Sequence, residues 1–186
     1  YYKLQGDAGW YLSGEISDKV PGASSQWPFA GTKSSGGAPI AAFSSYTATD
    51  ASGAGVNATL TVALFSAEEG WYSMYPEGEP QADLGAGVAL AVASGDAPVV
   101  AFTQGGSLLV KLYDSEANFW LPLGAPLPVT APTEPGHVHL EVDPLLDAPI
   151  LAFGSSLESG GPPLAFEVRR YLAEADTWQM LGSPDY

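Results

Sequence analysis

The only histidines of the chain, His137 and His139, stand two residues apart and are the first candidates for chemistry. Alternation along a strand would place both side chains on one face, a spacing that can ligate a metal ion. A metal site needs further ligands, and the nearby Glu134, Glu141 and Asp143 follow no fixed ligand pattern. We therefore interpret the pair as part of a solvated strand face and predict no metal site.

Acidic turns and hydroxyl groups offer two other chemistries. The pairs Asp143 with Asp147 and Glu77 with Glu79 carry the hard oxygens that Ca²⁺ prefers, but neither shows the regular alternation of a calcium loop. A nucleophilic Ser needs a base held by a third group, and the chain has no Gly-x-Ser-x-Gly elbow. Paired carboxylates of a glycosidase need a defined separation that no motif here specifies. We expect neither an enzyme nor a cofactor.

Charge and composition exclude several partners. The 6 basic and 21 acidic residues give a net charge of -15, which repels nucleic acid and anionic membranes. Every apolar run is shorter than the roughly 18 to 20 residues needed to cross a bilayer. The chain has no cysteine, so disulfides and thiolate sites are excluded. Asn57 begins an Asn-Ala-Thr sequon and is a glycosylation candidate if the protein is secreted.

A repeated motif determines the elements that position these residues. The pattern Ala-Pro-x-x-Ala-Phe occurs three times, and its copies end at Phe43, Phe102 and Phe153. A tryptophan follows each copy, and Trp10 precedes the first. Three of these four tryptophans begin a Trp-x-x-x-Gly motif; the exception has Tyr75 in place of the glycine. The four tryptophans are Trp10, Trp71, Trp120 and Trp178.

Each repeat divides into four short β segments separated by Gly, Asp, Ser and Asn. In the clearest copy they are Gly87 to Ser94, Pro98 to Thr103, Leu108 to Tyr113 and Phe119 to Leu123. The second is wholly apolar and is predicted to be buried on both faces. We expect an all-β chain of twelve to fourteen strands with little helix. The motif phenylalanines should be equivalent core residues, with Trp10, Trp120 and Trp178 also packed in the repeat core.

A period of about 50 residues with four antiparallel strands favours a β-propeller-like architecture, with a β-sandwich as the alternative. We predict a single domain made of a half blade, residues 1–14, and three full blades, residues 15–78, 79–124 and 125–186. The half blade lacks its first two strands. We expect a neighbouring subunit, or sequence outside this chain, to complete it, and the absence of an initiator Met suggests a processed product or a segment.

The order of these motifs resembles the degenerate kelch-like or tectonin-like repeats of secreted bacterial and algal surface proteins. The resemblance covers nearly the whole chain and implies a propeller-like scaffold in an extracellular or cell-surface setting; it transfers no catalytic residue. Two departures are the repeat of Trp71, which lacks its glycine, and Gln26-Trp27-Pro28-Phe29, which replaces a clean alternation.

These features predict an extracellular structural protein, a self-associating subunit of a homopolymeric filament or surface layer. The alternative is a glycan-binding or protein-binding propeller that acts through its variable loops, residues 44–56 and 154–163. Aromatic residues outside the regular pattern are the candidates for binding or assembly. They are Tyr1, Tyr2, Trp27, Trp71, Tyr72 and Tyr75.

Overall fold

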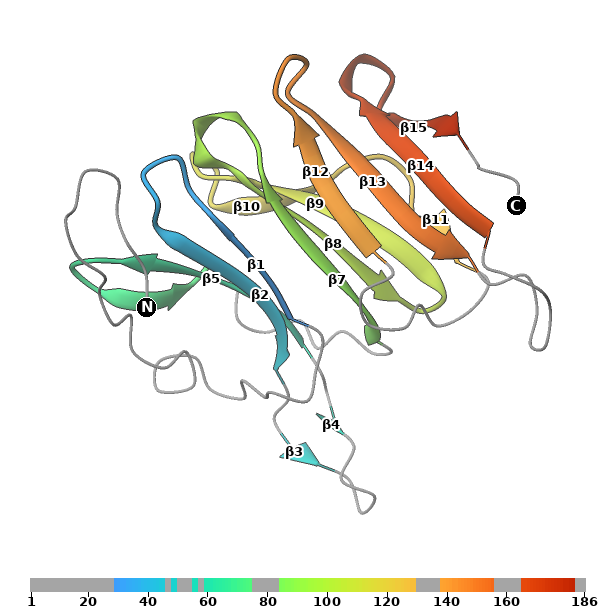
Figure 1. Cartoon of the computed structure of the whole chain (residues 1–186). Helices are drawn as coiled ribbons and strands as arrows, with labels where there is room; N and C mark the ends of the chain where they lie inside the picture. Colours follow the sequence, from blue (N-terminus) through green and yellow to red (C-terminus); the bar gives the residue numbers. More distant parts are fainter. Residues whose placement is uncertain are drawn as a thin grey trace. The chain divides into compact units, whose positions relative to one another are not determined.

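The computed structural model describes residues 29–45, 48–49, 55–56, 59–74, 84–129, 138–155 and 165–182. These residues are all-β, and within them no α-helix is present. They form three antiparallel sheets whose four main strands follow one another in chain order (Figure 1). Contacts divide the chain into two compact units, Tyr1–Leu84 and Gly85–Tyr186. The single-domain prediction and the predicted repeat boundaries stay predictions.

The first sheet contains β1 (Phe29–Lys33), β2 (Pro39–Ser45), β5 (Thr59–Ser66) and β6 (Gly70–Ser73). A two-stranded ribbon of β3 (Ala48–Thr49) and β4 (Gly55–Val56) is inserted between β2 and β5. This insertion falls in the loop that the sequence marks as variable.

The second sheet contains β7 (Leu84–Val92), β8 (Pro98–Gln104), β9 (Ser107–Asp114) and β10 (Phe119–Pro122). A two-residue strand, β11 (Leu127–Pro128), also pairs with β9. The third sheet contains β12 (Val138–Asp143), β13 (Ala148–Ser155), β14 (Ala165–Leu172) and β15 (Thr177–Gly182).

The three sheets share one register. In each, the second Ala of the Ala-Pro-x-x-Ala-Phe motif pairs with a Val of the third strand, as Ala42 with Val62, Ala101 with Val110 and Ala152 with Val168. The motif phenylalanine follows directly and is buried in every sheet. Phe43, Phe102 and Phe153 therefore hold the same buried position in the register of their sheets. Pro39 and Pro98 each begin a strand, where the missing N–H is tolerated.

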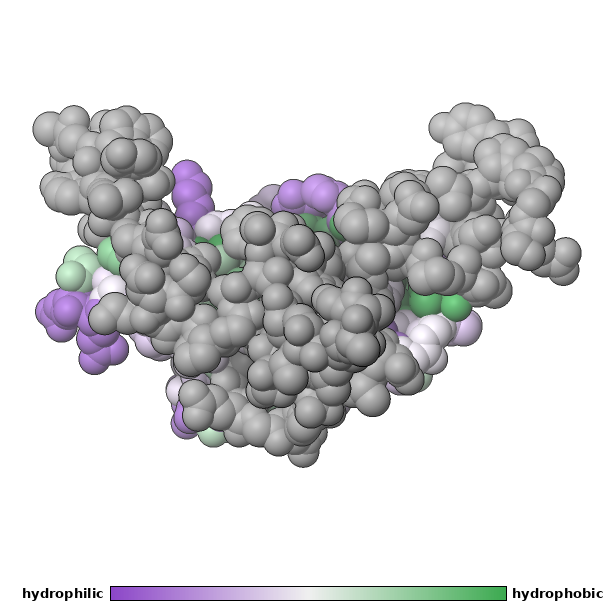
Figure 2. All heavy atoms as spheres, turned by 90° about the horizontal axis from the view of Figure 1, so that it is seen from below, coloured by the Kyte–Doolittle hydropathy of each residue, from purple (hydrophilic) through white to green (hydrophobic). Residues whose placement is uncertain are grey.

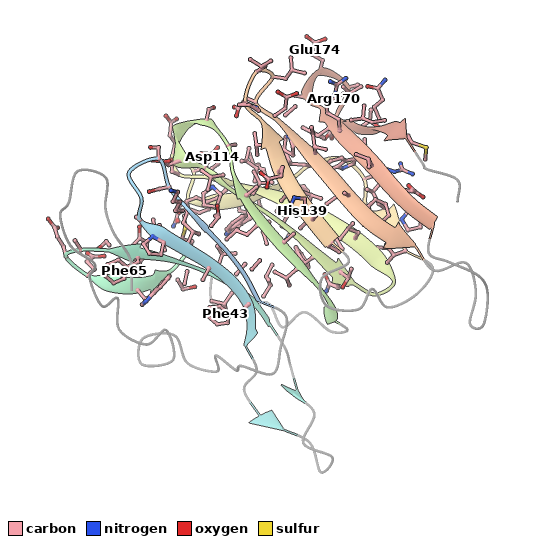
Figure 3. All side chains as sticks on the ribbon, in the orientation of Figure 1. Phe43, Phe65, Asp114, His139, Arg170 and Glu174 are labelled. Carbon is pink, nitrogen blue, oxygen red and sulfur yellow. The ribbon has the colours of Figure 1, made fainter. Side chains whose placement is uncertain are left out.

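Burial follows the repeat pattern. In the first sheet, Phe43 and Phe65 pack with Trp71 in one buried cluster, and the Phe65 and Trp71 rings meet edge to face at 5.6 Å. Figure 3 labels the two phenylalanines on this sheet. In the second sheet, β8 is buried over almost its whole length, as its apolar sequence predicts. The view from below shows both hydrophilic and hydrophobic side chains among the described residues of that face (Figure 2).

Candidate functional site: the contact between the second and third sheets

One apolar core joins the second and third sheets. Val99 and Ala101 of β8 share a buried cluster with Leu151 and Phe153 of β13 and with Trp178 of β15. Removing apolar surface from water contributes roughly 25 cal/mol per Å². Face-to-face burial of the two sheets is therefore the main source of their association.

A tryptophan of the third sheet packs against the residues that follow β10. The indole Nε1 of Trp178 donates a hydrogen bond to the carbonyl oxygen of Leu123 at 2.9 Å. A Cβ on Gly124 would lie only 2.9 Å from Cδ1 of the same indole, and Gly124 has a φ of +67°. Both the space and the backbone conformation require glycine. The Gly of the Trp-x-x-x-Gly motif thus makes room for the Trp of the next repeat.

Asp176 completes this contact through its carboxylate. Its Oδ1 accepts hydrogen bonds from the Gly124 N–H at 2.8 Å and from the Tyr171 hydroxyl at 2.7 Å. Burial, followed by the bond to Asp176, raises the pKa of Tyr171 to about 12. The bond from Tyr171, followed by that from Gly124, lowers the pKa of Asp176. We call Trp178, Asp176, Leu123 and Gly124 the clasp.

A second polar contact joins two turns at the same end of the sheets. Asp147, directly before the Ala-Pro of the third sheet, accepts hydrogen bonds from Ser94 in the β7–β8 turn. Its Oδ1 receives the backbone N–H at 2.8 Å and its Oδ2 receives the Ser94 hydroxyl at 2.5 Å. Hydrogen bonds therefore flank the apolar core in two places: between the β7–β8 and β12–β13 turns, and after the end of β10.

The second sheet repeats the Tyr–Trp pair that adjoins the clasp. The Tyr113 hydroxyl donates to Asn118 Oδ1 at 2.6 Å, and the Tyr113 and Trp120 rings lie 5.2 Å apart. The corresponding Tyr171 and Trp178 rings lie 5.5 Å apart. Asn118 holds the position of Asp176, two residues before the tryptophan, and both have positive φ.

The same corner of the third sheet is left exposed by the residues that the structure describes. Leu123 and Gly124 form the covered corner, and Leu181 and Gly182 are their sequence equivalents three and four residues after Trp178. Gly182 belongs to β15 and does not share the positive φ of Gly124. Leu123 is 8% exposed, whereas Leu181 is 47% exposed. A Cβ on Gly182 would meet nothing within 4 Å. We call Leu181 and Gly182 the open corner.

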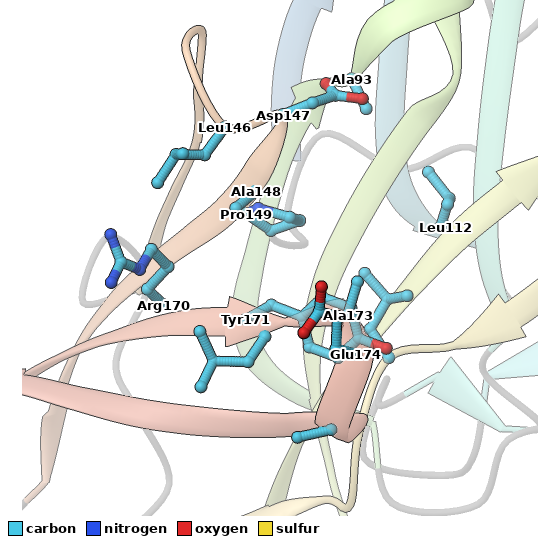
Figure 4. Close-up of a pocket in the computed structure, with 13 residues that line it drawn as sticks. Ala93, Leu112, Leu146, Asp147, Ala148, Pro149, Arg170, Tyr171, Ala173 and Glu174 are labelled. Carbon is cyan, nitrogen blue, oxygen red and sulfur yellow. The ribbon is translucent and has the colours of Figure 1, made fainter.

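A cleft of about 510 Å³ lies between the second and third sheets at their turn end (Figure 4). Its walls are mostly apolar and come from the ends of β7, β9 and β10, from the β12–β13 turn and from the β14–β15 turn. Leu112, Leu123, Leu146 and Pro149 line it together with Tyr171. Its volume is typical of small-molecule or side-chain binding sites.

The residues predicted from sequence fall into three groups. The motif phenylalanines, Trp71, Trp120 and Trp178 are buried, and Trp71 leaves its indole Nε1 without a hydrogen-bond partner. Tyr72 is 37% exposed and stands next to Trp71 on β6. The remaining candidates lie outside the described residues: Tyr1, Tyr2, Trp10, Trp27, Asn57 and Tyr75.

His139 and Glu141 lie 3.4 Å apart on the exposed side of β12. Within the described part of the chain, no group of three or more acidic or histidine side chains is placed to hold a metal ion. Those same ranges contain no helix long and apolar enough to cross a membrane.

Sequence reasoning missed the roles of Asp147 and Asp176. A usable signal was present: an Asp precedes Ala-Pro at both Asp96 and Asp147, and an Asn or Asp stands two residues before Trp at Asn118 and Asp176. All four have positive φ, a backbone conformation that Asn and Asp adopt more readily than most residues. Compared with known proteins, the sequence matches no family model and no curated protein.

Proposed function

We propose that this chain is a non-catalytic assembly protein, built from propeller-type repeats, whose copies join end to end in an extracellular filament or surface layer. The observation that carries the proposal is the open corner of the third sheet. Its residues repeat the covered corner, yet Leu181 stays exposed and Gly182 faces open space. The extracellular setting rests on the resemblance to secreted repeat proteins.

Separate observations support the hypothesis of propeller-type repeats. Each sheet is an up-and-down arrangement of four consecutive strands, and the sheets share one register. The second and third sheets pack through a contact that uses the repeat motifs themselves. A β-sandwich needs no such repetition of one strand order and register in successive sheets.

The clasp indicates what would occupy the open corner. The occupant is an indole that donates to the Leu181 carbonyl and lies over Gly182, as Trp178 does at Leu123 and Gly124. Trp10 begins the Trp-x-x-x-Gly motif that precedes the first sheet, so the repeat order assigns Trp10 of a second copy to this corner. Head-to-tail contacts of this kind propagate into filaments when they do not close.

Charge sets a condition on this association. Each copy carries a net charge of -15, so two copies repel at low ionic strength. The Debye length falls from about 30 Å at 0.01 M to about 10 Å at 0.1 M salt, which screens that repulsion. Association should therefore strengthen as salt is added.

The test is the particle mass of the chain by light scattering at low and moderate salt. We expect masses above that of one chain that grow with protein concentration and salt. Leu181→Asp, which buries a charge at the joint, should return the protein to single chains. Leu121→Asp is the matched control, because it also replaces an exposed leucine and adds the same charge. Leu121 lies on β10, away from the open corner of the third sheet. A monomeric parent at moderate salt, or equal effects of the two variants, would contradict the proposal.

A further inference from the structure

The β12–β13 turn differs from the equivalent turn of the second sheet. Aligned on Asp-Ala-Pro, Leu145 and Leu146 of the third sheet replace Ser94 and Gly95 of the second. Leu145 is 91% exposed and Leu146 is 59% exposed. Two neighbouring exposed leucines add little to the stability of the fold, because they bury little apolar surface. Clustered exposed apolar groups of this kind mark interaction surfaces.

The turn holds both leucines in a fixed position. Asp143 Oδ1 accepts hydrogen bonds from the backbone N–H of Leu145 at 2.9 Å and of Leu146 at 3.3 Å. At the other end of the turn, Asp147 is anchored to Ser94 of the second sheet. A preorganised turn loses little conformational entropy when a partner binds.

The exposed leucines lead into the cleft between the sheets. Leu146 is both exposed and part of the cleft wall, where it joins Leu112, Leu123 and Pro149 (Figure 4). A partner side chain that enters the cleft would therefore continue the apolar contact made on the turn. We call Leu145, Leu146 and this cleft the leucine site.

Charge around the leucine site selects the partner. Asp147 and Glu174 line the cleft, Asp143 lies at the start of the turn, and the whole chain is strongly acidic. The one cation among the lining residues is Arg170, whose Nη2 is already hydrogen-bonded to Gln179 Oε1 at 3.3 Å. In Figure 3, Arg170 and Glu174 lie toward the turn end of the third sheet.

From this combination we infer that the leucine site docks a polypeptide segment of another protein that presents apolar side chains flanked by lysine or arginine. The apolar side chains enter the cleft and pack on the leucines, and the flanking cations face the acidic rim. A second copy of this chain is a poor occupant of this site, because the acidic rim calls for cations beside the apolar side chains and the chain has only 6 basic residues against 21 acidic ones. The inference does not depend on self-association through the open corner.

The probes are two synthetic hexapeptides with a central Leu-Phe pair, flanked by lysines in one and by glutamates in the other. Binding is measured by isothermal titration calorimetry on the full chain. The lysine peptide should bind, and the glutamate peptide should bind at least tenfold more weakly. Raising the salt concentration should weaken the lysine peptide only, because its flanking charges contribute attraction.

The deciding variant is the double change Leu145→Ser with Leu146→Gly, which installs the residues of the second sheet's own turn. It should raise the Kd of the lysine peptide at least tenfold without lowering the melting temperature of the protein. Phe119→Ser is the matched control, because it removes another exposed apolar side chain from a different sheet, and it should leave the Kd unchanged. Equal binding of the two peptides, unaltered binding by the double variant, or no binding of either peptide would overturn the inference.

Discussion

Gly124 lies where the packing of the second and third sheets leaves least room for a side chain. An added Cβ would be 2.9 Å from Cδ1 and 3.0 Å from Nε1 of Trp178, so the indole or the backbone must shift. A left-handed φ costs a residue other than glycine roughly 1 to 2 kcal/mol. Overpacking a close contact adds about 1 to 3 kcal/mol. Gly124→Ala should therefore lower the free energy of unfolding by about 2 to 5 kcal/mol.

Gly95→Ala separates the two contributions. Gly95 has a φ of +68°, almost identical to the +67° of Gly124, but a Cβ there would meet nothing within 4 Å. Its loss should be only the backbone cost, about 1 to 2 kcal/mol. The assay is urea denaturation of both variants, followed by tryptophan fluorescence. Equal losses at the two glycines would refute the role that we assign to the clasp.

Four further predictions concern single side chains of the three sheets. Trp178→Phe should cost about 1 kcal/mol more than Trp71→Phe in urea denaturation, because only Trp178 loses a hydrogen bond, whereas the indole N–H of Trp71 has no acceptor. Asp176→Asn should keep the turn and remove the part of the acid destabilisation that is due to this carboxyl. The pKa of Asp176 in the folded protein is lower than the ordinary 3.8, so the stability it gives is present above pH 3.8 and is lost as the pH falls through the folded pKa. Tyr171→Phe should remove a loss of stability at alkaline pH. The pKa of Tyr171 is raised from 10.0 to about 12, so the stability it gives is present below pH 10 and lost as pH rises toward 12. Melting temperatures measured across pH test the Asp176 and Tyr171 predictions, and pH profiles that neither variant changes would contradict them. Phe102→Ala should cost about 3 to 5 kcal/mol as a core truncation, and a loss below 1 kcal/mol in urea would contradict its place in the core.

The strands could be predicted from the sequence because the patterns that define them involve neighbouring residues. The expected strand from Pro98 to Thr103 is observed as Pro98–Gln104, and that from Leu108 to Tyr113 as Ser107–Asp114. Continuous apolar runs and Gly- or Asp-rich turns are properties of adjacent residues, so they define strands without tertiary information.

The clasp could not be derived in the same way. Gly124 and Asp176 are 52 residues apart, and Leu123 and Trp178 are 55 apart, so their contacts depend on how two sheets pack. The repeat showed that a glycine recurs four residues after tryptophan, but the reason lies in the tryptophan of the following sheet. The leucine site was also missed, because two exposed leucines in a turn look locally like ordinary apolar residues.

We propose that the contact joining the second and third sheets also joins separate copies. Asp176, two residues before Trp178, lies in hydrogen-bond contact with Gly124; Ala8 stands two residues before Trp10, and Gly182 is the equivalent glycine. Because the chain has no cysteine, Ala8→Cys in one preparation and Leu181→Cys in another introduce the only thiols. Gly182 itself is kept, because a Cβ there would collide with the incoming indole as one on Gly124 would with Trp178.

The decisive measurement is the yield of disulfide-linked dimers under mild oxidation, with each preparation alone and with the two mixed. We expect heterodimers in the mixture far in excess of the dimers formed by either preparation alone. Equal yields from like and unlike pairs, or no cross-linked product in the mixture, would contradict it.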